Sequence, residues 1–197
     1  SSGGRRPETL LLSSEMGVLA AIDLGASNVD VALIAPDMTV LAHHAEPIEI
    51  AEGPGVVLSR VKDILRDLRK RCNIRAEKVI GIGIGVPGPV EFDSGLLVAP
   101  PIMPGWEGFS IREYLREEYA APAFIDNDVN VMAMGELWRL HRKLPNFLVV
   151  KIGTGIGCGI GRQRSRFTLV SCTVNRNGRH YLPRAHDTVR SLLPQNR

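Results

Sequence analysis

Three cysteines and the absence of a long apolar run are the first features that limit the class of this protein. The 197-residue chain places Cys72, Cys158 and Cys172 in no pair spacing, so neither a disulfide framework nor a zinc site is predicted. Its longest early apolar stretch, 18–22, meets Asp23 well before the roughly 20 residues that a membrane-spanning helix needs. Apolar residues make up 44% and charged residues 23% of the chain, which is ordinary for a globular protein. We therefore expect a soluble protein in a reducing, cytoplasmic setting, with no membrane partner.

Charge is unevenly distributed along the sequence. Residues 162–197 contain eight arginines, no lysine and one acidic residue, Asp187, which gives this segment a net charge of +7. The preceding 161 residues carry −4, so the net charge of +3 for the whole chain comes from its C-terminal part. A basic tail can bind nucleic acid. The abrupt change in composition also marks a boundary, and we predict that 162–197 forms an Arg-rich, irregular tail.

Hydrophobic patterns predict an α/β protein. Apolar residues that recur every three or four positions indicate helices, and continuous or alternating apolar runs bounded by turn residues indicate strands. The predicted elements are strands at 18–25, 28–35, 39–45, 78–86, 123–126 and 147–152 and helices at 53–72, 110–119 and 128–143. Tight connections join the first three strands, so we expect an antiparallel meander followed by alternating helices and strands in layers.

The turn between the first two strands is a candidate phosphate site. In DLGASN at 23–28, backbone N–H groups could face an anion, Ser27 and Asn28 could add donors, and Asp23 could hold Mg²⁺. The alternative is an ordinary hairpin turn that uses Gly25 for its backbone freedom. Taken alone, so short a motif favours the hairpin.

A second glycine-rich turn, GTGIGCG at 153–159, follows the apolar strand at 147–152 in the same manner. No Lys-Ser or Lys-Thr pair follows the glycines, which excludes a Walker loop, and no helix follows them, which excludes a dinucleotide fingerprint. The alternatives that remain are a phosphate-facing turn and a plain glycine-rich hairpin.

Asn127-Asp128 lies where a strand ends and a helix begins. Asn and Asp are favoured helix N-caps, which is a sufficient structural reason for both residues. The functional alternative makes Asp128 a general base on a hydroxyl group, with Asn127 orienting it.

The order of these motifs is more specific than any one of them. DLGASN, GIGVPGPV, MPGW, IDNDVNVMAMGE and KIGTGIGCGIG follow one another over about residues 16–161, and this set resembles the ROK family of sugar kinases and sugar-responsive repressors. The resemblance implies an actin-like, ribonuclease-H-like ATPase fold in two lobes, with mainly the first lobe in this chain. It also implies a hexose or hexose derivative as ligand, ATP and Mg²⁺ as cofactors in the case of a kinase, and a homo-oligomer.

The resemblance carries site roles onto matching residues. The family's kinases use Asp-X-Gly-X-Thr for the phosphates, and here Ser27 stands in the place of Thr. The implied catalytic residue is Asp128, and the implied metal ligand is Asp23. The implied substrate-binding residues are Pro87, Gly88, Asn127 and Asp128. The implied cofactor-binding residues are Asp23, Gly25, Ala26, Ser27, Asn28, Gly153, Thr154, Gly155 and Gly157.

Both ends of the chain depart from the family pattern. The resemblance therefore places the family lobe at 17–161. After Gly161 there is no Glu-X-Gly-His sugar motif and no cysteine-rich zinc cluster, so we expect a truncated or frameshifted product without most of the second lobe. Residues 1–16 are predicted to be a linker, and GGRRP followed by LLL resembles the segment after the wing of a winged-helix domain in ROK repressors. The alternative for this segment is a cloning scar with a flexible arm.

Two functions follow from the resemblance. The first is the sugar-binding effector domain of a ROK transcriptional regulator, which would reach DNA only through an upstream domain. The alternative is an ATP-dependent, glucokinase-like sugar kinase that transfers the ATP γ-phosphate to a hexose hydroxyl. The Arg-rich N-terminal segment and Ala26-Ser27 favour the regulator, whereas Asp128 keeps the kinase open. A non-functional remnant is the third option, and we expect no turnover from this chain.

Overall fold

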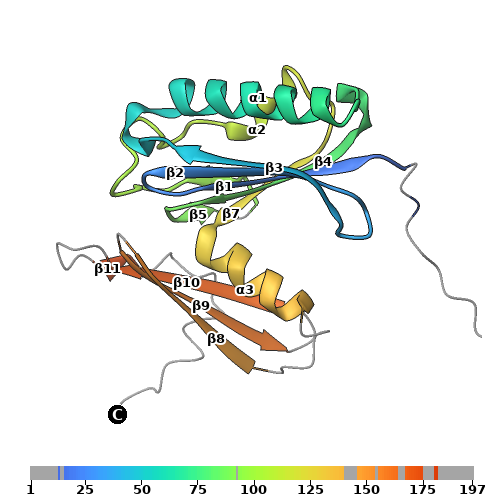
Figure 1. The fold of residues 1–197 in the computed structure, drawn as a ribbon. Coiled ribbons are helices and arrows are strands. Elements are labelled where there is room, and N and C mark those ends of the chain that lie inside the picture. Colours follow the sequence, from blue (N-terminus) through green and yellow to red (C-terminus); the bar gives the residue numbers. More distant parts are fainter. Residues whose placement is uncertain are drawn as a thin grey trace, which may run out of the picture.

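The structure is a computed structural model that describes residues 13, 16–91, 93–139, 146–153, 155–163, 167–174 and 180–181, with side chains described as far as Gly161. It has α/β architecture, with a five-stranded sheet, a four-stranded sheet and a small two-stranded hairpin (Figure 1). Within these residues, no helix is both long and apolar enough to span a membrane.

The five-stranded sheet has the strand order β3-β2-β1-β4-β7. Its first three strands are β1 (Val18–Leu24), β2 (Asn28–Ile34) and β3 (Val40–Pro47), and they pair antiparallel in sequence order. Strands β4 (Val79–Val86) and β7 (Ala123–Asn127) continue the sheet on the other side of β1 and run parallel to it. The predicted meander is confirmed, and the carboxyl ends of β1, β4 and β7 meet at one edge of the sheet.

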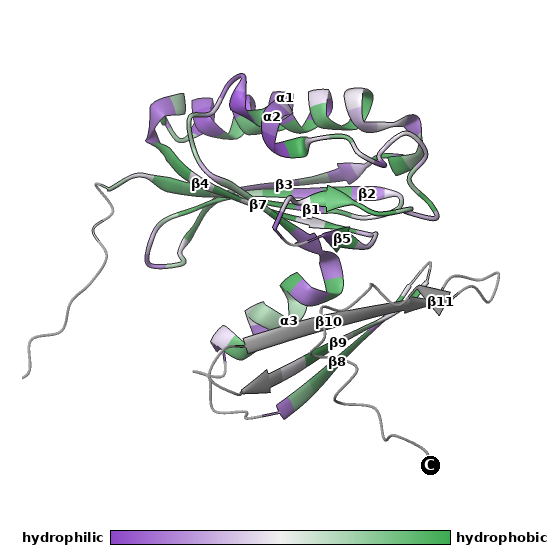
Figure 2. Ribbon diagram, turned by 180° about the vertical axis from the view of Figure 1, so that it is seen from behind, coloured by the Kyte–Doolittle hydropathy of each residue, from purple (hydrophilic) through white to green (hydrophobic). Residues whose placement is uncertain are grey.

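Two helices cover one face of this sheet, α1 (Pro54–Arg71) and α2 (Ile111–Arg116) (Figure 1). α1 begins with Pro54, which suits the first helical position because its missing N–H would have no partner there. α2 is capped by Ser110, whose hydroxyl accepts a hydrogen bond from the Glu113 N–H at 3.2 Å. Figure 2 shows the mainly hydrophobic strands β1 and β4 beneath these helices. The apolar side chains of α1 in this core are Val57, Leu58, Val61, Ile64, Leu65 and Leu68.

The opposite face of the sheet meets the third helix, α3 (Asp128–Arg139). Strand β4 carries glycines at alternate positions, and Gly85 lies where α3 begins. A Cβ atom at Gly85 would lie 3.1 Å from Asp23 Oδ1 and 3.5 Å from the Asp128 Cα atom. A larger residue would therefore separate the start of α3 from the end of β1.

The second sheet packs on the other side of α3, so that the helix lies between the two sheets (Figure 1). Its strands, in the order β11-β10-β9-β8, all pair antiparallel. They are β8 (Asn146–Ile152), β9 (Ile156–Gln163), β10 (Phe167–Val174) and β11 (His180–Tyr181). The helix approaches β9 at its glycines: a Cβ atom at Gly157 would overlap the side chain of Val129.

Two segments differ from the prediction. The loop after β4 contains a short hairpin, β5 (Val90–Glu91) and β6 (Leu96–Leu97). The tail expected to be irregular contributes the end of β9, β11 and all of β10, which pairs with β9 over 167–174. The segment FTLVSCTV is rich in Thr and Val, which favour strands, and the arginine content of the tail obscured this signal. The remainder of the tail, and all of the predicted linker except Ser13 and Met16, lie outside the described residues.

Candidate functional site

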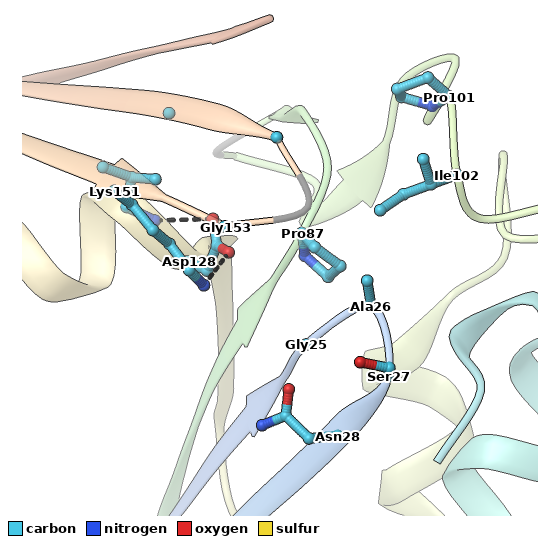
Figure 3. A pocket seen from close by; sticks show the side chains of 13 residues that line it. Gly25, Ala26, Ser27, Asn28, Pro87, Pro101, Ile102, Asp128, Lys151 and Gly153 are labelled. Carbon is cyan, nitrogen blue, oxygen red and sulfur yellow. Dashed lines mark hydrogen bonds and ion pairs between the residues drawn. The ribbon is translucent and has the colours of Figure 1, made fainter. Parts of the chain in front are cut away.

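A cavity of about 210 Å³ lies where the turns of the two sheets face each other across the start of α3 (Figure 3). The turn after β1 forms one wall, the turn between β8 and β9 forms another, and the loops after β4 close a third side. Most of the residues predicted for the site are brought together here. The lining residues are Gly25, Ala26, Ser27, Asn28, Pro87, Pro101, Ile102, Asp128, Val129, Lys151, Gly153, Gly155 and Gly157.

Backbone hydrogen bonds within the hairpin and to residues 48–50 fix the turn after β1. The Gly25 N–H donates to the Asn28 carbonyl at 2.8 Å, which closes a tight hairpin around Ala26-Ser27. The Ala26 carbonyl accepts from the Ile50 N–H at 3.1 Å, and the Ser27 carbonyl accepts from the Ile48 N–H at 3.2 Å. Because C=O and N–H point in opposite directions across a trans peptide, the Ser27 N–H points away from residues 48–50. The sequence left open a hairpin or an anion-facing turn, and this geometry is compatible with both.

The second turn connects β8 to β9. The Gly153 N–H donates to the Gly155 carbonyl at 2.9 Å, which makes this connection very tight. Gly153, Gly155 and Gly157, which the family resemblance implied as cofactor-binding residues, all line the cavity. Thr154, predicted to belong to the same turn, lies outside the described residues.

Asp128 is the acidic side chain of this cavity, and both of its carboxylate oxygens have partners. The residue is only 7% exposed. Its Oδ1 accepts a hydrogen bond from the Val129 N–H at 2.8 Å, and its Oδ2 forms an ion pair with Lys151 Nζ at 2.6 Å (Figure 3). Lys151 belongs to β8, so this ion pair joins the two sheets across the cavity.

Lys151 was not predicted from the sequence. The signal that could have revealed it is a single cationic residue in the apolar strand FLVVKI, two positions before the glycine-rich turn. A charge at that place interrupts an otherwise apolar strand, and a buried or half-buried charge requires a partner of opposite sign. Pro101, Ile102 and Val129 were also missed, because nothing local distinguishes them from ordinary loop and helix residues.

Asn127 and Gly88 lie behind the cavity wall. Asn127 is 2% exposed; its Nδ2 donates to the Gly88 carbonyl at 3.0 Å, and its Oδ1 accepts from the Val129 N–H at 3.1 Å. The amide thus ties the loop that carries Pro87 to the first turn of α3. Neither Asn127 nor Gly88 lines the cavity, although Pro87 does.

Asp23 also lies outside the lining of this cavity. It borders a larger hollow of about 1040 Å³ on the α3 side of the five-stranded sheet, together with Asp126, Asn130 and Trp138. Desolvation by the surrounding protein raises the pKa of Asp23, and the negative charges of Asp128 and Asp30 raise it further, whereas Lys151 acts in the opposite direction. These effects show that Asp23 belongs to the electrostatic environment of Asp128 even though it faces another hollow.

The residues of this environment do not form a ready-made metal site. A divalent ion such as Mg²⁺ takes oxygen ligands in near-octahedral geometry. In the described part of the chain, no group of three or more His, Cys, Asp and Glu residues could hold a metal ion. Next to Asp128 Oδ2, the place of a cation is taken by the ammonium group of Lys151. The role of Asp23 as a Mg²⁺ ligand stays a prediction.

A family model decides the identity of this architecture. The model of the ROK family matches residues 19–168. The chain belongs to the ROK family. This confirms the resemblance inferred from the motifs, and the match continues past Gly161 into β10.

ROK relatives of two functional kinds match the chain about equally well. A xylose repressor of Caldicellulosiruptor bescii is 30% identical over 161 residues, which cover 81% of this chain and 40% of the repressor. A glucokinase of Halalkalibacterium halodurans is 29% identical over 140 residues, covering 71% of this chain and 42% of the kinase. Identity alone therefore does not separate the two functions.

The fold comparison agrees with the family assignment. A ROK family protein of Streptococcus pneumoniae TIGR4, solved in complex with sucrose, superposes with a TM-score of 0.60 at 28% identity. The superposition covers 82% of this chain and 49% of that protein. The chain thus spans about half the length, or less, of these three relatives, and its α/β sheet is that of ROK structures over this part.

Proposed function

We propose that this ROK chain is the sugar-binding effector domain of a transcriptional regulator. The observation that carries the proposal is the state of Asp128. Its Oδ1 is engaged by the Val129 N–H at 2.8 Å and its Oδ2 by the Lys151 ammonium group at 2.6 Å. A general base needs a carboxylate oxygen within hydrogen-bond reach of the acceptor hydroxyl. Each Asp128 oxygen keeps a second lone pair that can accept a hydroxyl hydrogen bond, but the Lys151 ion pair would have to be broken before Oδ2 could take up the hydroxyl proton, which favours a binding role over phosphoryl transfer.

The same contacts suggest how a sugar would act as an effector. Asp128 starts α3 directly after β7, whereas Lys151 is on β8 of the other sheet. A sugar hydroxyl that donates to Asp128 competes with the Lys151 ammonium group, so binding alters an interaction that joins the two sheets. A ligand with different affinities for the joined and separated arrangements shifts their populations. In the regulator, a DNA-binding domain preceding this chain would respond to that shift.

A sugar kinase is the second candidate, and a specific observation supports it. Asp128 lies at the N-terminus of α3 and faces the glycine turns of both sheets in one cavity. If Lys151 moved away, Asp128 Oδ2 would be free to accept a hydroxyl proton, and the turns could bind phosphates through their N–H groups. ATP and Mg²⁺ would be the cofactors of this alternative, although the described residues offer no metal cluster.

Two measurements on the 197-residue chain distinguish these functions. Isothermal titration calorimetry with glucose, xylose and sucrose tests binding, and a coupled assay for ADP release tests phosphorylation of the same sugars with ATP and Mg²⁺. We expect binding of at least one sugar, its loss in Asp128→Asn, and no turnover. Turnover that Asp128→Asn abolishes would instead establish the kinase, and a chain that binds none of these sugars would contradict the proposal.

A further inference from the structure

The ion pair in the cavity has a consequence that is independent of which sugar binds. We infer that the Lys151 ammonium group is a built-in counter-cation for Asp128 and Asp23 and takes the place of a divalent metal ion, so that ligand binding in this cavity requires no Mg²⁺. The inference goes beyond the proposed function, because it concerns the charge balance of the site and holds whether or not the ligand is a sugar.

The first support is the position of the ammonium group. Lys151 Nζ lies 2.6 Å from Asp128 Oδ2, which is the length of a short, charge-assisted hydrogen bond. The Lys151 side chain retains 34% exposure, whereas that of Asp128 is 9% exposed. The cation therefore reaches a nearly buried carboxylate from the cavity side. A metal ion bound to the same oxygen would have to displace it.

The second support is the proximity of another carboxylate. Asp23 and Asp128 approach the same backbone position: a Cβ atom at Gly85 would lie 3.1 Å from Asp23 Oδ1 and 3.8 Å from Asp128 Cβ. Neighbouring carboxylates repel each other and attract a cation. The ammonium group that contacts Asp128 Oδ2 therefore lies close to a second negative charge.

The third support is the set of ligands. Mg²⁺ is usually held by one or two carboxylates together with waters and substrate phosphates, and here the ammonium group of Lys151 already lies against one of these carboxylate oxygens. Removal of the ammonium group would take away the counter-charge that the described residues place beside Asp128 and the two glycine turns. We expect such a site to recruit a divalent cation in place of the lysine.

Mn²⁺ binding tests this inference, with electron paramagnetic resonance reporting the free ion at pH 8, where protons compete little with the metal. Lys151→Met removes the charge with little loss of length and should bind Mn²⁺ at least about tenfold more tightly than the wild-type chain, since a charge next to the carboxylates is lost. Adding Asp128→Asn should remove this gain. Lys70→Met is the matched control, because Lys70 lies on exposed α1 surface 4.0 Å from Asp67 and its removal should change nothing.

Several outcomes would overturn the inference. One is a folded Lys151→Met variant, verified by circular dichroism, that binds Mn²⁺ no better than the wild-type chain. Another is Mn²⁺ binding by the wild-type chain that Asp128→Asn abolishes, and this measurement decides the question even if Lys151→Met does not fold. Lys151→Arg, which keeps the charge, should behave like the wild-type chain. Failure of sugar binding contradicts only the proposed function, because none of these measurements uses a sugar.

Discussion

Asn127→Ala is the substitution whose cost follows most directly from the structure. The Asn127 side chain is almost fully buried, and it joins two segments that are far apart in the sequence. Its Nδ2 donates to the Gly88 carbonyl at 3.0 Å, and its Oδ1 accepts from the Val129 N–H at 3.1 Å. The Nδ2 atom also lies 3.5 Å from the Val86 carbonyl, at the limit of a hydrogen bond, and alanine removes all of these contacts. The Val129 N–H keeps Asp128 Oδ1 as a partner, but the Gly88 carbonyl loses the amide donor.

The expected magnitude comes from the two shorter bonds, to the Gly88 carbonyl and from the Val129 N–H. A typical intramolecular hydrogen bond contributes about 0.5–1.5 kcal/mol, and a buried group left without a partner costs about 1–3 kcal/mol. We therefore expect Asn127→Ala to lower the free energy of unfolding by about 2–4 kcal/mol. Asn127→Asp keeps the size and the Oδ1 acceptor but loses the donor to Gly88, and it adds a negative charge next to Asp128. It should destabilise the protein by a similar amount.

Urea unfolding, followed by far-ultraviolet circular dichroism, measures both changes. The slope of the free energy against urea should stay constant, since the surface exposed on unfolding is nearly unchanged. Asn146→Ala is the control, because Asn146 is an exposed residue at the start of β8 and its loss should cost less than about 0.5 kcal/mol. An Asn127→Ala variant as stable as this control would refute the role assigned to the buried amide.

Two further predictions use the same unfolding measurement. Gly157→Ala places a methyl group against Val129 and should lower the free energy of unfolding by about 1–3 kcal/mol. Gly153→Ala should not lower it, because nothing lies within 4 Å of the added methyl group. Equal effects of the two substitutions would contradict the close packing of α3. Hydrogen bonding, above all to Arg60, lowers the pKa of Glu46 from 4.5 to about 2. The ionised Glu46 therefore contributes fully to the free energy of unfolding above pH 4.5, and this contribution is lost as the pH falls towards 2. In Glu46→Gln, the free energy of unfolding should therefore fall less between pH 4.5 and 2 than in the wild-type chain. A variant with the wild-type pH profile would contradict this prediction.

The sheet and the turns of the site could be predicted from the sequence because their signals are local. DLGASN and GTGIGCG each follow an apolar strand, and glycines next to polar residues predict turns wherever they fall. The alternation of glycine and β-branched residues in 78–86 likewise predicts a strand with one bare face. Each of these patterns extends over fewer than about ten residues, so it can be recognised from neighbouring positions alone.

The contacts that define the site could not be predicted, because their partners are distant in sequence. Asn127 looked like an N-cap or a sugar ligand, but its amide donates to Gly88, 39 residues earlier. Lys151 was placed in a strand by its apolar neighbours, yet its pairing with Asp128, 23 residues earlier, depends on how α3 packs against the second sheet. The strand character of β10 was hidden by the arginines around it, since net charge says little about which residues pair in a sheet.

The glycines of this chain explain why the two sheets can share one cavity. Gly85 lets the start of α3 approach the end of β1, and Gly157 and Gly159 let the same helix approach β9. α3 thus packs closely against both sheets, which brings its first residue, Asp128, within reach of Lys151 on β8. Gly157, which the sequence suggested was present for phosphate groups, is therefore required first by helix packing. Any ligand of the cavity binds to a geometry that these contacts have already fixed. The unequal loss of stability predicted for Gly157→Ala and Gly153→Ala distinguishes a glycine required for helix packing from one that is not.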